Sequence, residues 1–194
     1  IDLTKKRVGI IGTGATAVQV IPEIAKIVHN LFVFQRTPSS IDVRDQRETT
    51  PEEIEQWKNE PGWAVARRER LAKISSGRTA LKGNDEYLSG KVDYLKDRKR
   101  HTKELSQQEL IQKQLNTNFR IMEQIRARVD SIIEDPETAT ALKPYYPYGC
   151  KRPTFHDEFL PSFNKPNVTL IDTAPLGVTE INENGVVHSS TEYP

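Results

Sequence analysis

The sequence predicts an α/β protein that combines a parallel sheet, a small antiparallel excursion and an inserted helical subdomain. Three short segments are predicted as strands of this sheet, at residues 8–11, 31–34 and 167–171, and residues 31–34 form the continuous apolar run that a buried parallel strand requires. One amphipathic segment separates the first two strands, and a much longer helical region separates the second from the third. A strand, a helix and a second strand in this order predict a βαβ unit with a right-handed crossover.

The first strand runs directly into a glycine-bounded turn. Residues 12–17 have the form G-x-G-x-x-A, with Gly12, Gly14 and Ala17 at the three small positions. Gly12 permits a tight turn, Gly14 lets the backbone approach a pyrophosphate, and Ala17 lets the next helix pack near the strand. The helix N-terminus then favours negative charge through its unpaired N–H groups and its dipole. This segment predicts a Rossmann-like dinucleotide-binding domain.

The second strand predicts which dinucleotide is bound. It follows a helix expected over residues 14–28, which contains an interior proline, Pro22, and it ends at Gln35 and Arg36. NAD-binding domains usually place Asp or Glu here to bind the ribose 2′-hydroxyl. A guanidinium at this place instead suits a 2′-phosphate. The pattern favours NADP over NAD, and the alternative is a solvated arginine at a strand end.

Residues 39–144 are predicted to form a helical insertion in the sheet. Two capping boxes mark helix starts, Thr50 with Glu53 and Ser106 with Glu109. Helices are expected from residue 51 to a break at residues 61–62, over residues 63–74 and over residues 136–142. The longest helix follows Ser106, where apolar residues recur at three- and four-residue spacing as far as Ile132. We interpret these apolar stripes as core, not as cofactor contacts.

An aromatic, proline-rich loop at residues 145–153 precedes the return to the sheet. Lys151 and Arg152 are adjacent in this loop. Two neighbouring cations on a stiff loop repel each other unless an anion lies nearby, and the alternative is a solvated surface pair. A hairpin is predicted between residues 177–181 and 186–187, and residues 191–193 could add a further short strand.

Composition excludes several classes of function. The net charge of +1 argues against a general polyanion binder, and the single cysteine, Cys150, excludes an internal disulfide and a cysteine-rich metal site. The histidines are too scattered for a metal site, so no metal is expected. No apolar run approaches the length of a membrane span, and the N-terminus is not a signal peptide. We therefore expect a cytoplasmic protein without a membrane partner.

Two motifs in the insertion receive no functional role. A basic cluster between Lys96 and Lys103 has no interleaved aromatic residues, so it predicts a solvated face and no nucleic-acid partner. Tyr87 and Lys91 match the Y-x-x-x-K pair of short-chain dehydrogenases. Those enzymes use a differently spaced glycine turn, and we interpret this match as chance.

Three separated segments together resemble Baeyer–Villiger monooxygenases, which depend on FAD and NADPH. They are residues 6–17, residues 34–38 and residues 149–158, where Gly-Cys-Lys-Arg-Pro precedes Phe-His-Asp-Glu. The match is closest to the larger, fungal-type members and covers the whole chain. It implies an enzyme that inserts one oxygen atom of O₂ next to a ketone carbonyl to give an ester or lactone.

The resemblance also implies roles for particular residues. Arg36, Thr37 and Lys151 would hold the 2′-phosphate, and Arg152 would be the active-site arginine that stabilises negative charge beside the flavin. The three cations would therefore converge on one nucleotide. The cofactor-binding residues implied at the glycine turn are Gly12, Thr13, Gly14, Ala15, Thr16, Ala17 and Gln19.

The same resemblance sets the expected domain organisation. Residues 1–194 would form the NADP-binding domain, with sheet parts at 1–38 and 145–194 and the family's helical subdomain at 39–144. The family's second glycine motif, for FAD, is not in the sequence, so we expect the FAD-binding domain in the remainder of a larger enzyme. Two alternatives stay open. One is the NADPH-binding part of a heteroatom-oxidising flavin monooxygenase, and the other is a stand-alone nucleotide-binding module without catalysis.

Overall fold

The computed structural model describes residues 2–75 and 106–194, and contacts divide the chain into two compact units. Unit 1 contains residues 1–43 and 119–194, and unit 2 contains residues 44–118. Unit 2 contains fewer residues than the helical insertion predicted over residues 39–144. The boundaries of that insertion stay a prediction. The basic cluster between Lys96 and Lys103 and the Tyr87–Lys91 pair lie outside the described residues.

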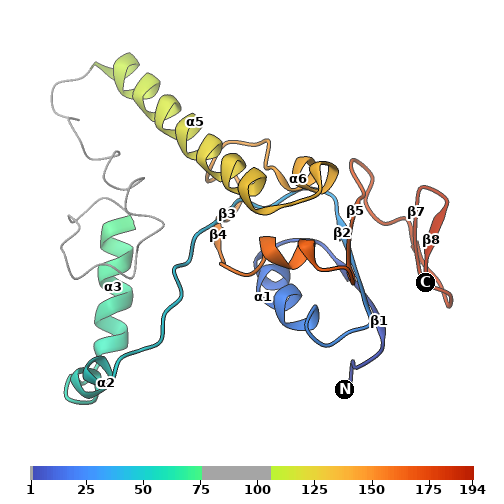
Figure 1. Cartoon of the computed structure of the whole chain (residues 1–194). Coiled ribbons are helices and arrows are strands. Elements are labelled where there is room, and N and C mark those ends of the chain that lie inside the picture. Colours follow the sequence, from blue (N-terminus) through green and yellow to red (C-terminus); the bar gives the residue numbers. More distant parts are fainter. Residues whose placement is uncertain (1, 76–105) are drawn as a thin grey trace. The chain divides into compact units, whose positions relative to one another are not determined.

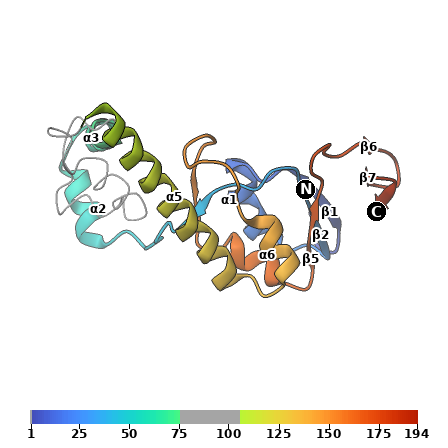
Figure 2. The ribbon, with the colours of Figure 1, turned by 90° about the horizontal axis from the view of Figure 1, so that it is seen from above.

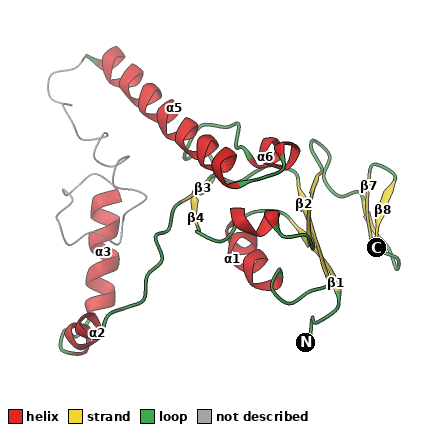
Figure 3. Ribbon diagram, viewed as in Figure 1, coloured by secondary structure: helices red, strands yellow, loops and turns green. Residues whose placement is uncertain are grey.

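Unit 1 is built on a three-stranded parallel sheet with the strand order β1-β2-β5 (Figures 1 and 3). Strand β1 is Arg7–Ile11, β2 is Asn30–Gln35 and β5 is Val168–Asp172. All three coincide with the segments predicted as strands and confirm the predicted α/β fold class. Because the strands are parallel, their carboxyl ends lie at one edge of the sheet.

Three α-helices contribute to unit 1. Helix α1 is Ala15–Ile24, α5 is Gln107–Ile132 and α6 is Pro136–Leu142. Helix α5 begins in unit 2 and continues into unit 1. Helix α6 begins where the Asp135 side chain accepts a hydrogen bond from the Thr138 N–H at 2.8 Å. These helices confirm the ones predicted after the glycine turn, after residue 106 and over residues 136–142.

Helix α1 stops short of its predicted end at residue 28. Beyond Ile24 two backbone hydrogen bonds join residues three apart. The Lys26 N–H donates to the Glu23 carbonyl at 3.3 Å, and the Ile27 N–H donates to the Ile24 carbonyl at 3.0 Å. Such bonds between residues three apart are common at helix ends. Pro22 lies inside the helix and has no N–H to donate. The apolar period of the sequence therefore extends past the regular helix.

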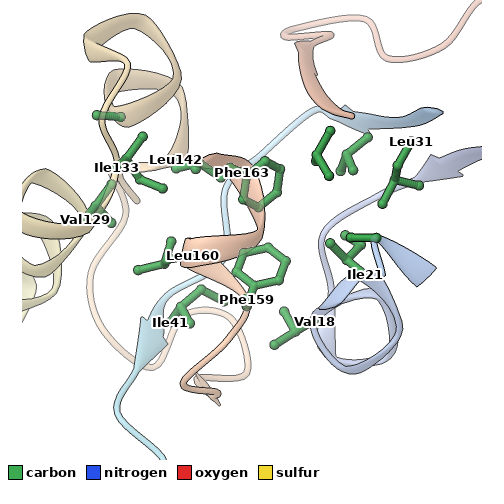
Figure 4. Packing of buried hydrophobic residues seen from close by; sticks show 14 of the residues in the cluster. Val18, Ile21, Leu31, Ile41, Val129, Ile133, Leu142, Phe159, Leu160 and Phe163 are labelled. Carbon is green, nitrogen blue, oxygen red and sulfur yellow. The ribbon is translucent and has the colours of Figure 1, made fainter. Parts of the chain in front are cut away.

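One hydrophobic cluster fills the space between the sheet and these helices. At its centre is the 3₁₀ helix η2, Leu160–Asn164, which the sequence pattern does not predict. Phe159 and Phe163 pack edge to face with ring centroids 5.1 Å apart, between the α1 and α5 side chains of the cluster (Figure 4). The buried members are Val18, Ile21, Ala25, Val28, Leu31, Val33, Ile41, Val129, Ile133, Ala139, Leu142, Phe159, Leu160, Phe163 and Val168.

A small antiparallel sheet follows β5. Its strands are β6 (Glu180–Ile181), β7 (Val186–His188) and β8 (Thr191–Tyr193), in the order β6-β7-β8. They confirm the predicted hairpin and the further short strand. Seen from above, α1 and α6 lie on one side of the parallel sheet and β6 and β7 on the other (Figure 2).

The side chains of β2 divide between these two sides. Leu31 and Val33 are fully buried in the hydrophobic cluster beneath the helices. Phe34 points the other way, and its ring meets Tyr193 of β8 edge-on with centroids 5.4 Å apart. Because successive strand side chains alternate, Gln35 returns to the helix side, in the same row as Leu31 and Val33.

A two-residue parallel pair joins distant parts of unit 1, and the sequence does not predict it. Strand β3 is Ile41–Asp42 and β4 is Thr154–Phe155. Burial raises the pKa of Asp42, against the opposing effects of the Val43 N–H and the nearby Arg128 guanidinium. Burial lowers the pKa of Arg128 in turn. Two groups of opposite charge, on β3 and α5, are therefore both partly buried in unit 1.

Two helices lie wholly in the described part of unit 2, and hydrogen bonds between neighbouring residues fix the start of the first one. Helix α2 is Pro51–Lys58 and α3 is Trp63–Ser75, as predicted. The Glu53 N–H donates to Thr50 Oγ1 at 3.3 Å, and the Thr50 N–H donates to Glu53 Oε2 at 2.9 Å. This is the predicted capping box. Trp57 and Trp63 stack with ring centroids 4.5 Å apart and close the corner between the two helices.

Candidate nucleotide-binding site

The glycine turn lies at the carboxyl end of β1. Gly12 has a φ of +96°, a left-handed conformation that favours glycine. Its N–H donates to the Phe34 carbonyl of β2 at 2.7 Å, so the turn extends the sheet by one hydrogen bond before α1 begins. Ligands of open α/β sheets bind outside the carboxyl ends of the strands. The turn therefore occupies the place expected of a nucleotide-binding segment.

Neither the backbone conformation of Gly14 nor the packing around it requires a glycine. Its φ of −75° and ψ of −176° are open to any residue. A Cβ added to Gly14 would have no described atom of the protein within 4 Å. Open space at this glycine is what the motif predicts for the approach of a pyrophosphate to the backbone.

Helix α1 begins beside Gly14 without a side-chain cap. Gly14 is the N-cap residue, and the first turn contains no acidic residue. The free N–H groups and the helix dipole favour an anion at this position. Ala15 and Thr16 lie in this first turn, and the Gln19 side-chain amide donates to the Ala15 carbonyl at 2.9 Å. The structure thus brings these predicted residues together at one helix end.

The side chains of Thr13 and Ala17 face the protein. Thr13 is buried, and its hydroxyl lies 3.1 Å from Gln35 Oε1 and 3.3 Å from the Thr37 carbonyl. The Ser39 hydroxyl donates to the Thr13 carbonyl. Ala17 packs against the hydrophobic cluster. These side chains hold the turn in place, so any nucleotide contact from Thr13 or Ala17 would come from the main chain.

A cavity of about 550 Å³ lies at the carboxyl ends of β2 and β5. Arg36 and Pro38 follow β2, Asp172 ends β5, and α6 supplies a further wall. The cavity has the volume of a typical small-molecule site. Its lining residues are Arg36, Pro38, Pro136, Glu137, Thr140, Ala141, Lys143, Tyr145, Asp172 and Ala174.

Arg36 is the predicted phosphate ligand that lines this cavity, and Thr37 is half-buried next to it. Lys151 lies over the ring of Tyr146, with Nζ 5.1 Å from the ring centroid. The Tyr146 hydroxyl donates to the Pro38 carbonyl at 2.9 Å. The loop that carries Lys151 is therefore tied to the segment that directly follows Arg36.

Lys151 and Arg152 are both exposed, and neither lines the cavity. Only one of the three cations predicted to converge, Arg36, contributes to the cavity wall. The convergence of Arg36, Lys151 and Arg152 on one nucleotide therefore stays a prediction.

Sequence reasoning missed Gln35 and the α6 wall. Gln35 is 1% exposed, and its Nε2 donates to the Ala141 carbonyl of α6 at 2.8 Å. A signal for Gln35 does exist in the sequence, because it continues the inward row of Leu31 and Val33 with a polar group. No local pattern, by contrast, indicates that α6 returns to the end of β2.

The described residues meet neither the requirements of a metal site nor those of a membrane-spanning helix. Within residues 2–75 and 106–194, no three His, Cys, Asp or Glu side chains are grouped so as to hold a metal ion. In the same parts of the chain, no helix combines the length and the apolar character that crossing a membrane requires.

Known proteins match the chain over nearly its whole length, although no family model does. A Baeyer–Villiger monooxygenase of Streptomyces coelicolor is 44% identical over 197 residues, which cover 99% of this chain and 32% of that protein. The polycyclic ketone monooxygenase of Thermothelomyces thermophilus is 43% identical over 208 residues, 99% of this chain and 31% of that protein. The chain thus spans about a third of the length of these relatives.

Solved structures agree with the sequence matches. The structure of the polycyclic ketone monooxygenase from Thermothelomyces thermophila superposes with a TM-score of 0.77 at 40% identity and covers 99% of this chain and 32% of its own. The complex of OTEMO with FAD and NADP superposes with a TM-score of 0.69 at 26% identity, over 99% of this chain and 37% of its own. The resemblance predicted from three short segments is confirmed, and this chain is homologous along its length to one part of the Baeyer–Villiger monooxygenases.

Proposed function

We propose that this chain is the NADP(H)-binding portion of an FAD- and NADPH-dependent Baeyer–Villiger monooxygenase. The whole enzyme inserts one oxygen atom of O₂ next to a ketone carbonyl and yields an ester or lactone. The observation that carries the proposal is 44% identity, over 99% of this chain, to a protein named for that reaction. The glycine turn and the cavity beside β2 support it independently.

The residues present fit NADP. The main chain at Gly14 leaves open space, and α1 offers an uncapped N-terminus, which together suit a pyrophosphate. Arg36 lines the cavity, and a guanidinium suits a 2′-phosphate. Thr37 and Lys151 complete the proposed phosphate contacts. When bound, NADPH supplies the hydride that reduces the flavin.

FAD, ketone and O₂ complete the proposed reaction. One relative, OTEMO, was crystallised with both FAD and NADP. We propose that FAD is held mainly by the remainder of the enzyme, which is the partner of this chain. We propose no nucleic-acid or membrane partner, and a cytoplasmic location.

Arg152 is the proposed catalytic residue. It lies on the exposed loop that also carries Lys151, directly before Pro153. A fixed guanidinium stabilises negative charge that develops during a reaction, and loss of such a group lowers the rate by roughly a hundredfold to a thousandfold. Arg152 would therefore act on the chemical step, whereas Arg36 would act on NADPH binding.

The experiment measures ester formation from ketones by the intact enzyme with NADPH. Arg152→Ala is expected to lower kcat for ester formation by about a hundredfold or more and to leave the Kd for NADPH within about threefold. Arg7→Ala is the matched control, because Arg7 is an exposed arginine at the opposite, amino-terminal edge of the sheet. It is expected to change neither quantity.

The alternatives predict different results in the same assay. A heteroatom-oxidising enzyme would oxidise amines or sulfides and produce no ester. A stand-alone nucleotide-binding module would bind NADPH without consuming O₂. If Arg152→Ala formed the ester as fast as the wild type does, the proposed catalytic role of Arg152 would be wrong. The proposed family of the enzyme would still stand.

A further inference from the structure

Gln35 connects two walls of the candidate nucleotide site. It is the last residue of β2 and is 1% exposed. Its Oε1 accepts a hydrogen bond from Thr13 Oγ1 at 3.1 Å, and its Nε2 donates to the Ala141 carbonyl at 2.8 Å. One buried amide therefore joins the glycine turn to helix α6.

The main chain of Gln35 anchors a third element. Its carbonyl accepts the Thr173 N–H at 2.8 Å, and Gln35 lies opposite Asp172 in the register of β2 and β5. Arg36, the next residue, lines the cavity, and so do Ala141 and Asp172. A displacement of Gln35 would consequently move three sides of the cavity.

We propose that Gln35 is a positioning residue that sets the preference of the site for NADP over NAD. This inference rests on the proposed NADP-binding function and deepens it. A neutral amide donates one hydrogen bond and accepts another, as Ala141 and Thr13 require. A carboxylate at position 35 would only accept, so its oxygen would face the Ala141 carbonyl oxygen.

The charge of the residue at position 35 matters as much as its hydrogen bonds. NAD-binding domains place an acidic side chain at the end of this strand, where it binds the ribose 2′-hydroxyl. A carboxylate at position 35, directly before Arg36, would add a negative charge that repels a 2′-phosphate. The other charged residues that line the cavity are Glu137, Lys143 and Asp172, and Lys143 pairs with Asp130 at 2.5 Å.

The test measures the Kd of the intact enzyme for NADP⁺ and for NAD⁺ in the variant Q35E. At about pH 8 we expect NADP⁺ to bind about tenfold or more weakly, and NAD⁺ to change by less than about threefold. Burial raises the pKa of a carboxyl. The protonated carboxyl can donate to the Ala141 carbonyl, so the loss of NADP⁺ affinity should shrink as the pH is lowered towards about 6.

Two controls isolate this effect. Wild-type enzyme is titrated at every pH, because the second ionisation of the nucleotide phosphate falls near pH 6. Q112E introduces the same change of charge on α5, where the exposed Gln112 amide donates to Asn116 Oδ1 at 2.9 Å. We expect Q112E to match the wild type for both nucleotides at every pH.

Q35M separates the hydrogen bonds from the charge. It removes both side-chain hydrogen bonds of Gln35 without adding a carboxyl. We expect NADP⁺ to bind about threefold to tenfold more weakly, with the pH dependence of the wild type, and KM for NADPH to rise while kcat stays nearly constant. Should Q35E fail to fold, as judged by thermal unfolding, Q35M decides the question.

The outcomes distinguish this inference from the proposed function beneath it. Wild-type affinity for NADP⁺ in both Q35E and Q35M would overturn the positioning role. Equal, pH-independent losses of NADP⁺ and NAD⁺ in Q35E would overturn the role in specificity. A wild-type enzyme that binds neither nucleotide would refute the proposed function itself, and this inference with it.

Discussion

The described residues of unit 1 and of unit 2 are stabilised in different ways. Among the described residues, the buried hydrophobic side chains lie in unit 1, apart from Ile74 of α3. Helix α2 buries none of its residues and begins with a capping box. Unit 1 therefore depends on packing between distant segments, whereas helix α2 of unit 2 depends more on contacts between neighbours. The candidate site lies in unit 1, where packing can hold its groups in place.

The largest expected difference between the units concerns core truncation. Phe159→Ala removes a fully buried ring at the centre of unit 1 and is expected to lower the free energy of unfolding by about 3–5 kcal/mol. Ile54→Ala in α2 removes a side chain that is 43% exposed, and is expected to cost less than about 0.5 kcal/mol. Denaturant unfolding followed by circular dichroism measures both values.

Tryptophan fluorescence adds a separate report on unit 2. The chain has two tryptophans, Trp57 and Trp63, and both lie in unit 2. We expect Phe159→Ala to shift the circular dichroism transition while the fluorescence transition moves less. Identical shifts of both transitions would show that the two units unfold cooperatively, and the proposed contrast would be wrong.

The next largest effect tests the site in unit 1. Arg36→Ala is expected to weaken NADPH binding by about tenfold to a hundredfold, because a hydrogen bond to a charged group contributes about 1.5–3 kcal/mol. NADH, which has no 2′-phosphate, should bind almost unchanged. Nucleotide titrations measure both affinities. Equal losses for NADPH and NADH would mean that Arg36 does not contact the 2′-phosphate.

Replacing each glycine of the turn by alanine should have a different main effect. Gly14→Ala should chiefly weaken NADPH binding, and Gly12→Ala should chiefly lower the stability. Gly14→Ala should change the stability by less than about 1 kcal/mol, because the backbone conformation suits alanine whereas the N-cap position favours glycine. It should also weaken NADPH binding about tenfold, because the added methyl group would enter the space proposed for the pyrophosphate.

Gly12→Ala is the matched variant and should chiefly affect folding. Its φ of +96° is unfavourable for alanine, so we expect a stability loss of about 1–2 kcal/mol. Thermal unfolding and NADPH titration of the two variants provide the comparison. If the Gly14→Ala variant bound NADPH as well as the wild type does, the proposal that the pyrophosphate lies against Gly14 would be wrong.

The parts of the fold that could be predicted are those with a local signal. The runs around Val8, Leu31 and Val168 predicted the parallel strands, and the continuous apolar run at Leu31 marks β2, the central and most buried of the three. The side chains of Thr50 and Ser106 predicted helix starts, because a capping box involves residues only three apart.

The parts that could not be predicted depend on contacts between distant residues. The β3–β4 pair is two residues long and joins Ile41 to Thr154, so no periodic pattern reveals it. The 3₁₀ helix at Leu160–Asn164 likewise depends on the space left between α1 and α5. For the site, the motif indicated Gly14 and Arg36, but the bond from Gln35 to Ala141 exists only once α6 reaches the end of β2.

The smallest expected effect is that of the Glu53 charge on helix α2, and it should be confined to unit 2. Hydrogen bonds from the Arg47 guanidinium and the Thr50 N–H lower the pKa of Glu53 to about 2. A lowered pKa stabilises the folded state above the ordinary pKa of the group, and this stabilisation is lost as the pH falls towards the folded value. Glu53→Gln removes the charge, so the backbone N–H groups of α2 after Pro51 should exchange faster with solvent near neutral pH.

Hydrogen exchange at single residues can decide this point. In the wild type, protection of α2 should fall between about pH 4.5 and pH 2, whereas in Glu53→Gln it should be low already and nearly independent of pH in that range. The amides of β2 in unit 1 should keep their protection in the variant. If Glu53→Gln weakened β2 as much as α2, the capping box would act on the whole chain, and the distinction between a packed unit and a locally stabilised one would fail.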